Sequence, residues 1–247
     1  MSGILYIVST PIGNLEDITL RALRVLREVD LILAEDTRVT RKLLEHYKIK
    51  KELARYDEYS HAKIVNWILG QLEQGKNIAL VSDAGTPGIS DPGQRLVNYL
   101  VTKSSGHLAV KSLSHSVIES PSHLDAIVKV VPIPGSNAAI TALSVSGFPT
   151  EKFCFLGFPS HKKGREKFFK NVAARKETTV FYESPHRILK TLDQLQEFVL
   201  PDREIMIARE LTKMFETIYR GTISNVKKEI STKELRGEFV IILNAVS

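Results

Sequence analysis

The stretch that most constrains the fold of this chain runs from residue 80 to residue 93 and reads LVSDAGTPGISDPG. An apolar run, Ile78 to Val81, passes there directly into glycine, proline and small polar residues. Glycine permits positive φ and proline fixes φ, so the pattern predicts a loop of one defined shape after a buried strand. Gln94 to Val101 then predicts a helix with one apolar face. Strand, loop and helix in this order are typical of open α/β sheets, which bind small ligands at such loops.

Asp83 and Asp91 lie at the two ends of this loop. A carboxylate at the end of a buried strand costs free energy unless it caps backbone amides or meets a ligand. A structural turn and a ligand loop therefore both stay open. The loop matches neither G-x-G-x-x-G nor G-x-x-x-x-G-K-[ST], so a ligand held through nucleotide phosphates is not indicated.

The same order of elements precedes the central loop. Ile4 to Val8 predicts a buried strand that runs into a second Gly/Pro turn, Ser9 to Asp17. Asp17 is expected to cap a helix whose apolar stripe is Leu20, Leu23, Leu26 and Val29. This alternation of strands and helices indicates a mostly parallel sheet with right-handed crossovers.

Charged side chains follow the next short strand, Leu31 to Ala34. Glu35, Asp36 and Arg38 begin the segment after it, and they either cap the following helix or belong to a site. The residues alone do not decide between these roles.

Residues 102–127 differ in composition from the rest of the chain, because they are rich in serine and histidine and show no sustained hydrophobic period. We expect an insertion here, within a first domain of residues 1–134. His107, His115 and His123 lack the spacing of zinc-binding helices, and no cysteine or carboxylate cluster accompanies them, so we expect no metal site. Strands and helices alternate again in a second domain of residues 135–247.

The charge of the chain favours an anionic partner, since 34 Lys and Arg against 28 Asp and Glu give a net charge of +6. A basic cluster around Lys162, Lys163 and Arg165 is typical of contacts to a phosphate backbone. Arg187 follows a strand end and is a further candidate. Cys154 is the sole cysteine, and no signal peptide or membrane span stands out, so we expect a cytoplasmic protein without membrane contact.

The sequence shows no set of residues for nucleophilic catalysis, because no Ser, Cys or Lys lies in a motif that would activate it. Reactions with a strong electrophile and an ordinary oxygen nucleophile need mainly alignment and at most one general base. Methyl transfer from a sulfonium donor is such a reaction.

Short motifs follow one another over nearly the whole chain: STPIGNLEDIT, AEDTR, SDAGTPGISDPG, VPIPGSNAA, FYESPHR, ARELTK and RGEFV. In this order they resemble the tetrapyrrole methylase superfamily, and more narrowly its branch of small-subunit ribosomal RNA 2′-O-methyltransferases. The resemblance implies two α/β domains, with a mostly parallel sheet in the first and a mixed sheet in the second. It also implies S-adenosylmethionine in a cleft between the domains, a cytidine ribose of 16S rRNA as acceptor, and a homodimer.

Site residues are carried over from the same resemblance. It implies donor-binding roles for residues of both halves: Pro11, Asp83, Ala84, Gly85, Thr86, Leu156, Tyr182 and Ala208. For the general base that accepts the ribose proton, Asp36 and Glu35 are the candidates, because both end a strand next to the donor loops. Contacts to the RNA backbone are expected from Arg38, Lys162, Lys163, Arg165 and Arg187.

Two other functions stay open at this point. One is a tetrapyrrole-type methylase that acts on a small macrocycle, which has no need of the basic cluster that starts at Lys162. The other is a non-catalytic RNA-binding protein of the same fold, which has no need of a constrained loop such as SDAGTPG.

Overall fold

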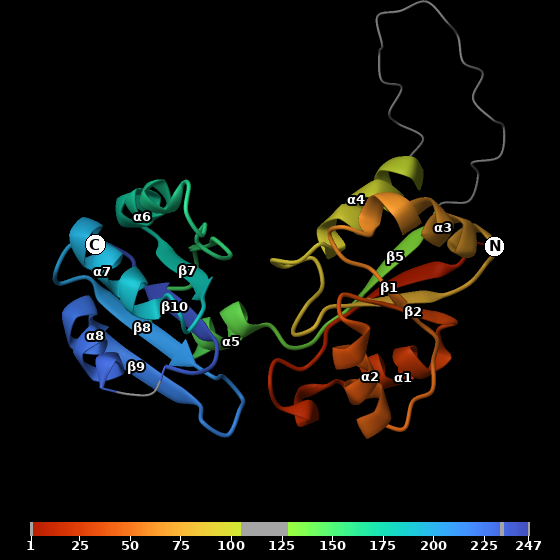
Figure 1. Ribbon diagram of the computed structural model, residues 1–247, viewed down its shortest axis with the longest axis horizontal. Helices are drawn as coiled ribbons and strands as arrows, with labels where there is room; N and C mark the ends of the chain where they lie inside the picture. Colours follow the sequence, from red (N-terminus) through yellow and green to blue (C-terminus); the bar gives the residue numbers. More distant parts are fainter. Residues whose placement is uncertain (1, 105–127, 233–234, 247) are drawn as a thin grey trace, which may run out of the picture. The chain divides into compact units, whose positions relative to one another are not determined.

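The computed structural model of the protein describes residues 2–104, 128–232 and 235–246. The chain forms two compact units (Figure 1). The first consists of Met1–Pro11 and Leu15–Ser136, and the second of Ile12–Asn14 and Asn137–Ser247.

The first unit contains a five-stranded sheet in the order β3-β2-β4-β1-β5, and every neighbouring pair is parallel. Parallel order places the carboxyl ends of all these strands at one edge of the sheet. The strands and helices follow in the order β1 (Ile4–Val8), the 3₁₀ helix η1 (Leu15–Asp17), α1 (Leu20–Glu28), β2 (Leu31–Ala34), α2 (Thr37–His46), β3 (Leu53–Arg55), α3 (His61–Glu73), β4 (Ile78–Val81), α4 (Gly93–Ser104) and β5 (Lys129–Ile133).

Both faces of this sheet are covered by helices, with α1 and α2 on one side and α3 and α4 on the other (Figure 1). Alternate strand residues divide between the faces: Ile32 joins the cluster under α1 and α2, while Leu31 and Leu33 join the cluster under α3 and α4. Burial on both faces explains why these strands read as unbroken apolar runs.

The start of α1 differs from the expectation. Thr19 caps this helix by accepting a hydrogen bond from the Ala22 amide at 3.1 Å, whereas Asp17 ends the preceding 3₁₀ helix. Leu20 is 86% exposed and does not belong to the apolar stripe. The expected cap at Asp17 was therefore wrong by two residues, because the chain makes a 3₁₀ turn before α1 begins.

The expected insertion falls mostly on residues 105–127, which lie outside the described residues. Its first residues, 102–104, belong instead to α4.

The second unit contains a mixed five-stranded sheet in the order β6-β7-β10-β8-β9. β6 and β7 are parallel, and the other neighbours are antiparallel, as expected for this half. Its strands and helices are α5 (Ala138–Ser144), β6 (Phe153–Phe155), α6 (Arg165–Ala174), β7 (Thr178–Glu183), α7 (Ile188–Phe198), β8 (Glu204–Arg209), β9 (Thr217–Thr222), α8 (Ile223–Ser231) and β10 (Phe239–Leu243).

The core of the second unit lies on both faces of this sheet. One cluster joins the sheet to α6, α7 and α8, and includes Phe169, Phe181 and Ile223. The other joins it to α5 and includes Ala142 and Ala208. Helix α8 has no counterpart among the sequence-based expectations, although Ile223, Val226 and Ile230 give it a regular apolar stripe.

Candidate functional site

The candidate site of the first unit lies at the carboxyl edge of its parallel sheet. The loops after β1, β2, β3 and β4 all leave the sheet at this edge, and each carries polar residues. Two of these loops, after β1 and β4, are the Gly/Pro segments that the sequence singled out.

These two loops are locked together by backbone hydrogen bonds. The Thr10 amide donates to the Gly85 carbonyl at 2.8 Å, and the Gly85 amide donates to the Thr10 carbonyl at 3.0 Å. The buried Thr10 hydroxyl also donates to the Ser82 carbonyl at 3.1 Å. Ser9 Oγ lies 3.0 Å from Thr86 Oγ1, which donates to the Ser136 carbonyl at 3.0 Å. The loops therefore behave as one rigid piece.

The shape of the central loop depends on Asp91 and on glycines. Asp91 accepts hydrogen bonds from the Gly88 amide at 2.8 Å and from the Gly93 amide at 2.7 Å. Gly85 and Gly88 have φ of 82° and 89°, in the left-handed region that favours glycine. A Cβ on Gly93 would meet Asp91 Oδ1 at 2.8 Å. Asp91 is thus the loop's internal cap, whereas Asp83 accepts a hydrogen bond from outside the loop, from the Asp36 amide.

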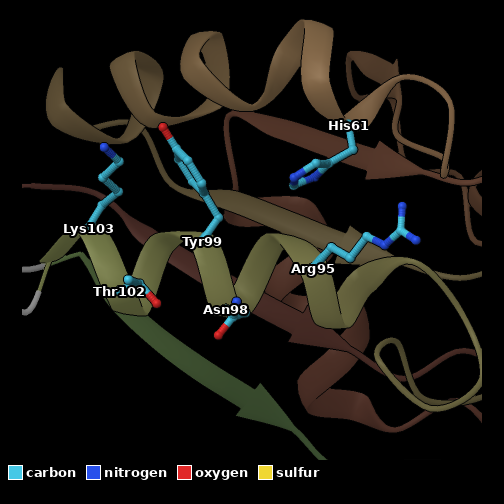
Figure 2. Close-up of a pocket in the computed structure, with 6 residues that line it drawn as sticks. All are labelled: His61, Arg95, Asn98, Tyr99, Thr102 and Lys103. Atoms are coloured by element: carbon cyan, nitrogen blue, oxygen red, sulfur yellow. The ribbon is translucent and has the colours of Figure 1, made fainter. Parts of the chain in front are cut away.

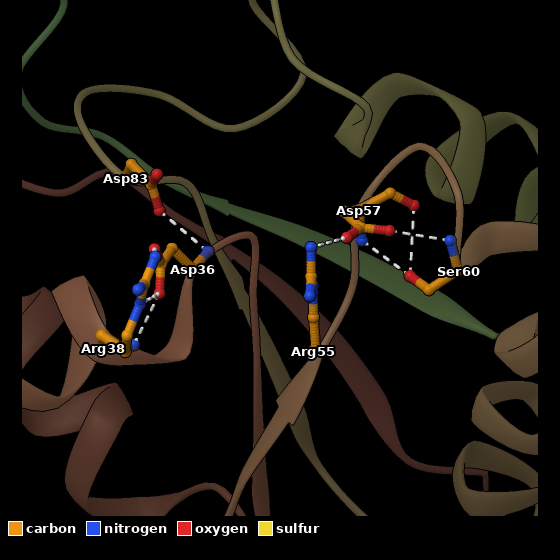
Figure 3. Close-up of polar contacts among 6 residues, drawn as sticks. All are labelled: Asp36, Arg38, Arg55, Asp57, Ser60 and Asp83. Atoms are coloured by element: carbon orange, nitrogen blue, oxygen red, sulfur yellow. Dashed lines mark hydrogen bonds and ion pairs between the residues drawn. The ribbon is translucent and has the colours of Figure 1, made fainter.

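Asp36 and Asp83 connect the loops after β2 and β4 (Figure 3). Asp83 accepts a hydrogen bond from the Asp36 amide at 2.9 Å. The Asp36 side chain caps α2 by accepting from the Arg38 amide at 2.8 Å, and it forms a bidentate ion pair with the Arg38 guanidinium, with Nη2 at 2.5 Å. Hydrogen bonding to Arg38 holds the pKa of Asp36 far below its usual range.

Glu35 differs from Asp36 in its environment. Its side chain is half-buried, and within the described part of the chain no hydrogen bond or ion pair to it is found. Desolvation raises the pKa of Glu35, and the neighbouring Asp83, Asp91, Asp57 and Asp36 raise it further. Of the two candidate bases, Glu35 is therefore the one whose carboxylate has no partner among the described residues and whose proton affinity is increased.

The loop after β3 was not predicted from the sequence, because β3 itself is too short to show a hydrophobic period. Arg55 pairs with Asp57 at 2.6 Å, and Asp57 accepts from the Ser60 amide at 2.7 Å (Figure 3). The Ser60 hydroxyl accepts from the Asp57 amide at 2.7 Å. The segment D-x-x-S, a pattern that allows reciprocal side-chain to backbone hydrogen bonds in a turn, is the signal that would have found it.

The donor-binding residues expected in the first unit are all in these loops. Asp83 and Ala84 are exposed, Pro11 and Thr86 are half-buried, and Gly85 is buried in the bridge to Thr10.

Those expected in the second unit are only partly brought together. Tyr182, Val240 and Ala208 form a row across β7, β10 and β8, and the Tyr182 hydroxyl accepts from the Ala139 amide at 3.2 Å. Leu156 packs against the cluster on the other face, although its amide donates to the Val180 carbonyl beside Tyr182.

The basic residues of the second unit fall into two groups. Lys162 and Lys163 are exposed in the loop before α6. Arg165 is 5% exposed, and its guanidinium donates to Glu183, Thr191 and Gln194 at 3.2, 2.5 and 2.6 Å. This burial was unexpected, since Arg165 is the first residue of a helix whose neighbouring basic side chains are exposed.

Arg187 belongs to the same buried network. It pairs with Glu183 at 2.7 Å and donates to Ser184 Oγ and to the Pro159 carbonyl, each at 3.1 Å. Glu183 is 1% exposed and thus balances two guanidinium groups. The network joins the loop that carries Lys162 to the turn after β7.

Two findings concern the described residues alone. No group of three or more His, Cys, Asp or Glu side chains among them is arranged to hold a metal ion. No helix within the same residues is long and apolar enough to cross a membrane.

Comparison with known proteins identifies close relatives. Residues 4–227 match the family model of tetrapyrrole (corrin/porphyrin) methylases. The chain is 45% identical over 242 residues to ribosomal RNA small subunit methyltransferase I of Bacillus subtilis (strain 168), covering 98% of this chain and 75% of that protein. It is 43% identical over 242 residues to the protein of the same name from Thermotoga maritima, covering 98% of each.

Solved structures share the fold at lower identity. The methyltransferase CobJ superposes with a TM-score of 0.66 at 20% identity, covering 99% of this chain and 95% of that one. Uroporphyrin-III C-methyl transferase from Thermus thermophilus, complexed with S-adenyl homocysteine, superposes with a TM-score of 0.62 at 19% identity, covering 98% and 97%. Since the family model covers residues 4–227 and the relatives align over almost the whole chain, the protein belongs to the tetrapyrrole (corrin/porphyrin) methylase family.

Proposed function

We propose that the protein transfers a methyl group from S-adenosylmethionine to the 2′-oxygen of a cytidine ribose in 16S ribosomal RNA. The relatives are named ribosomal RNA small subunit methyltransferases, and the sequence motifs resemble the branch that methylates the 2′-oxygen. The observation that carries the proposal is the pair of loops locked by Thr10 and Gly85, which presents carboxylates and backbone at the edge of a parallel sheet.

The chemistry of this edge fits the donor. S-adenosylmethionine supplies a methyl group on a positively charged sulfonium and also carries an ammonium group. Glu35 and Asp83 provide negative charge in the same place, and the phosphate-binding loops of nucleotide sites are missing from the sequence. The residues that we propose to hold the donor are Pro11, Asp83, Ala84, Gly85 and Thr86 of the first unit, and Leu156, Tyr182 and Ala208 of the second.

We assign the general base to Glu35 rather than to Asp36. Asp36 is engaged by the Arg38 guanidinium and by the Arg38 amide, and its lowered pKa makes it a weak proton acceptor. Glu35 follows the strand residue that pairs with Val81 of β4, so it leaves the sheet beside the central loop. A carboxylate with a raised pKa accepts a hydroxyl proton more readily near neutral pH.

The basic residues expected to contact RNA fall into an exposed group and a group paired with Glu183. Lys162, Lys163 and Arg38 are exposed, and we propose that they bind backbone phosphates of the RNA. Arg165 and Arg187 are occupied by Glu183, so we give them a positioning role. Arg187 holds the Pro159 carbonyl and thereby fixes the start of the loop that presents Lys162 and Lys163.

Two measurements test the function. Calorimetric titration of S-adenosylmethionine into the protein measures donor binding, and transfer of a tritiated methyl group to small ribosomal subunits that lack this mark measures the reaction. Nuclease digestion of the labelled RNA should release 2′-O-methylcytidine. Transfer to a tetrapyrrole but not to the subunit would establish the small-molecule methylase instead, and the absence of donor binding would leave an RNA-binding protein.

Variants of the two acidic residues test the base. Glu35→Gln should lower the single-turnover rate strongly while it leaves the affinity for the donor unchanged. Asp36→Asn is the matched control, since it removes one carboxylate from the adjacent position, and it should lower the rate less. Equal rates for the two variants would remove Glu35 from the mechanism.

We also propose a cytoplasmic homodimer, as the sequence resemblance implies. A ribosomal RNA substrate is located where ribosomes are assembled. In the second unit, Met214 and Phe215 are 91% and 69% exposed, which is typical of apolar side chains that meet a partner. Light scattering after size-exclusion chromatography measures the mass directly, and a monomer at micromolar concentration would refute the dimer.

A further inference from the structure

A pocket lies between α3 and α4 of the first unit (Figure 2). Its volume is about 280 Å³, and it has no role in the function proposed above. Its lining combines cationic, aromatic and neutral polar side chains: His61, Arg95, Asn98, Tyr99, Thr102 and Lys103.

The cationic part of the lining comes from one face of α4. Arg95, Tyr99 and Lys103 are spaced four residues apart, so they follow one another along the helix, and Tyr99 and Lys103 point toward α3 (Figure 2). Lys103 Nζ lies 5.8 Å from the centroid of the Tyr99 ring. Arg95 pairs with Glu58 at 2.9 Å, but both side chains are more than half exposed, so this pair is easily exchanged for another anion.

The aromatic part of the lining is held in place by hydrogen bonds to other side chains. The Tyr99 hydroxyl donates to Asn66 Oδ1 at 2.6 Å. His61 Nδ1 lies 2.7 Å from the hydroxyl of Tyr56, whose side chain is buried. The rings of His61 and Tyr99 lie 6.3 Å apart at 85°. Because these rings are fixed before a ligand arrives, binding costs little side-chain entropy.

We propose that this pocket binds an unpaired nucleotide of the RNA substrate, with its base against the Tyr99 ring and its flanking phosphates at Arg95 and Lys103. The proposal rests on the proposed RNA substrate. Bases stack on aromatic side chains whatever their sequence, and cations spaced along a groove follow the backbone of a single strand.

The position of the pocket favours RNA over another protein as its occupant. Its first lining residue, His61, directly follows the loop of Asp57 and Ser60 at the carboxyl edge. A strand of RNA that leaves the pocket on this side thus reaches the edge that we propose for methyl transfer. The α4 helix adds two positive charges and no negative charge, which fits a polyanion.

The charge contacts are tested by salt dependence. Binding of a short fluorescein-labelled single-stranded RNA of mixed sequence is measured by anisotropy over a range of KCl concentrations. Loss of two phosphate contacts in Arg95→Gln/Lys103→Gln should reduce the slope of log K against log salt by about 1.4. The matched control is Arg24→Gln/Arg27→Gln on α1, which removes the same charge from the opposite face and likewise frees a glutamate from an exposed pair. A slope equal to that of the control overturns the proposal.

The stacking contact is tested by a pair of substitutions at Tyr99. Tyr99→Phe loses the bond to Asn66 but keeps the ring, so RNA affinity should stay near that of the unmodified protein. Tyr99→Leu removes the ring and should weaken binding between about fivefold and a hundredfold. Equal affinities for the two variants would refute stacking, and a thermal unfolding scan checks that both are folded.

The outcomes separate this inference from the function on which it rests. If the unmodified protein neither binds the RNA nor methylates subunits, the RNA substrate itself is wrong. If it does both, and the pocket variants bind like the α1 control, the substrate stands and the pocket is not part of its binding surface.

Discussion

The two guanidinium groups that meet the buried carboxylate of Glu183 give the sharpest stability prediction. Glu183 accepts hydrogen bonds from Arg165 Nη2 at 3.2 Å and from the Thr191 hydroxyl at 2.6 Å, and it pairs with Arg187 at 2.7 Å. Glu183→Gln keeps the shape of the side chain but removes the only carboxylate found between these two cations in the described network. Breaking a buried ion pair from one side costs about 3 to 5 kcal/mol, because a charge is left without a counter-charge.

Calorimetry and urea unfolding at neutral pH measure this loss. For a chain of this size each kcal/mol corresponds to about 2 to 4 °C, so the transition of the second unit should fall by about 6 to 20 °C. Glu177→Gln is the matched control, since Glu177 pairs with Arg175 at 2.6 Å with both side chains about one-third exposed. Water reaches both of these side chains, so this pair should contribute about 1 kcal/mol or less.

A second substitution sharpens the result. Arg165→Met added to Glu183→Gln removes one of the two unbalanced charges, so the double variant should regain part of the lost stability. The reasoning fails if Glu183→Gln costs no more than Glu177→Gln, or if Arg165→Met adds its full cost to the double variant. Either result would mean that water reaches the network and compensates the charges.

Three further predictions concern the first unit. The raised pKa of Glu35 means that the folded state holds this proton more tightly than the unfolded state, so stability falls as pH rises between the two pKa values. Glu35→Gln should therefore raise the melting temperature at neutral pH and leave it nearly unchanged in acid, although it slows methyl transfer. A lower melting temperature at neutral pH would contradict the desolvated environment assigned to Glu35. Gly93→Ala forces Cβ to within 2.8 Å of Asp91 Oδ1, so donor affinity measured by calorimetry should fall at least tenfold, by about 1.4 kcal/mol; unchanged affinity would show that the loop's shape does not matter. Thr10→Val removes the bond to the Ser82 carbonyl and should cost about 1 kcal/mol in urea unfolding; a neutral result would mean that the backbone bridge alone holds the loops.

Several elements of the fold were predictable from local pattern. β1, β2 and β4 have the predicted bounds, because strands buried on both faces appear as continuous apolar runs between turn residues. The strand β3 has three residues, too few to show a period, and it was missed. Helix α1 begins after Thr19 rather than Asp17, since several polar residues in a row offer more than one cap and only the backbone path selects one.

The sequence indicated which loops form the candidate site, but not which contacts hold those loops together. Gly/Pro loops after predicted parallel strands indicated which segments meet at one edge, because strand direction alone requires it. The bridge between Thr10 and Gly85 joins residues far apart in the chain, and no local pattern encodes such a pair. The pocket between α3 and α4 was missed for the same reason, since its lining comes from two helices.

Residue type and spacing were enough to predict the alternation of strands and helices, the turn-forming loops, and the excess of positive charge. The role of each charged residue, in contrast, depends on the tertiary structure. Glu35 and Asp36 are neighbours of the same chemistry, yet one is desolvated and the other is paired with Arg38. Arg165 and Lys163 lie in one basic run, yet one is buried on Glu183 and the other is exposed. The free energy of a charge depends on its burial and on partners brought in by other strands and helices, and these are set only when the chain has folded.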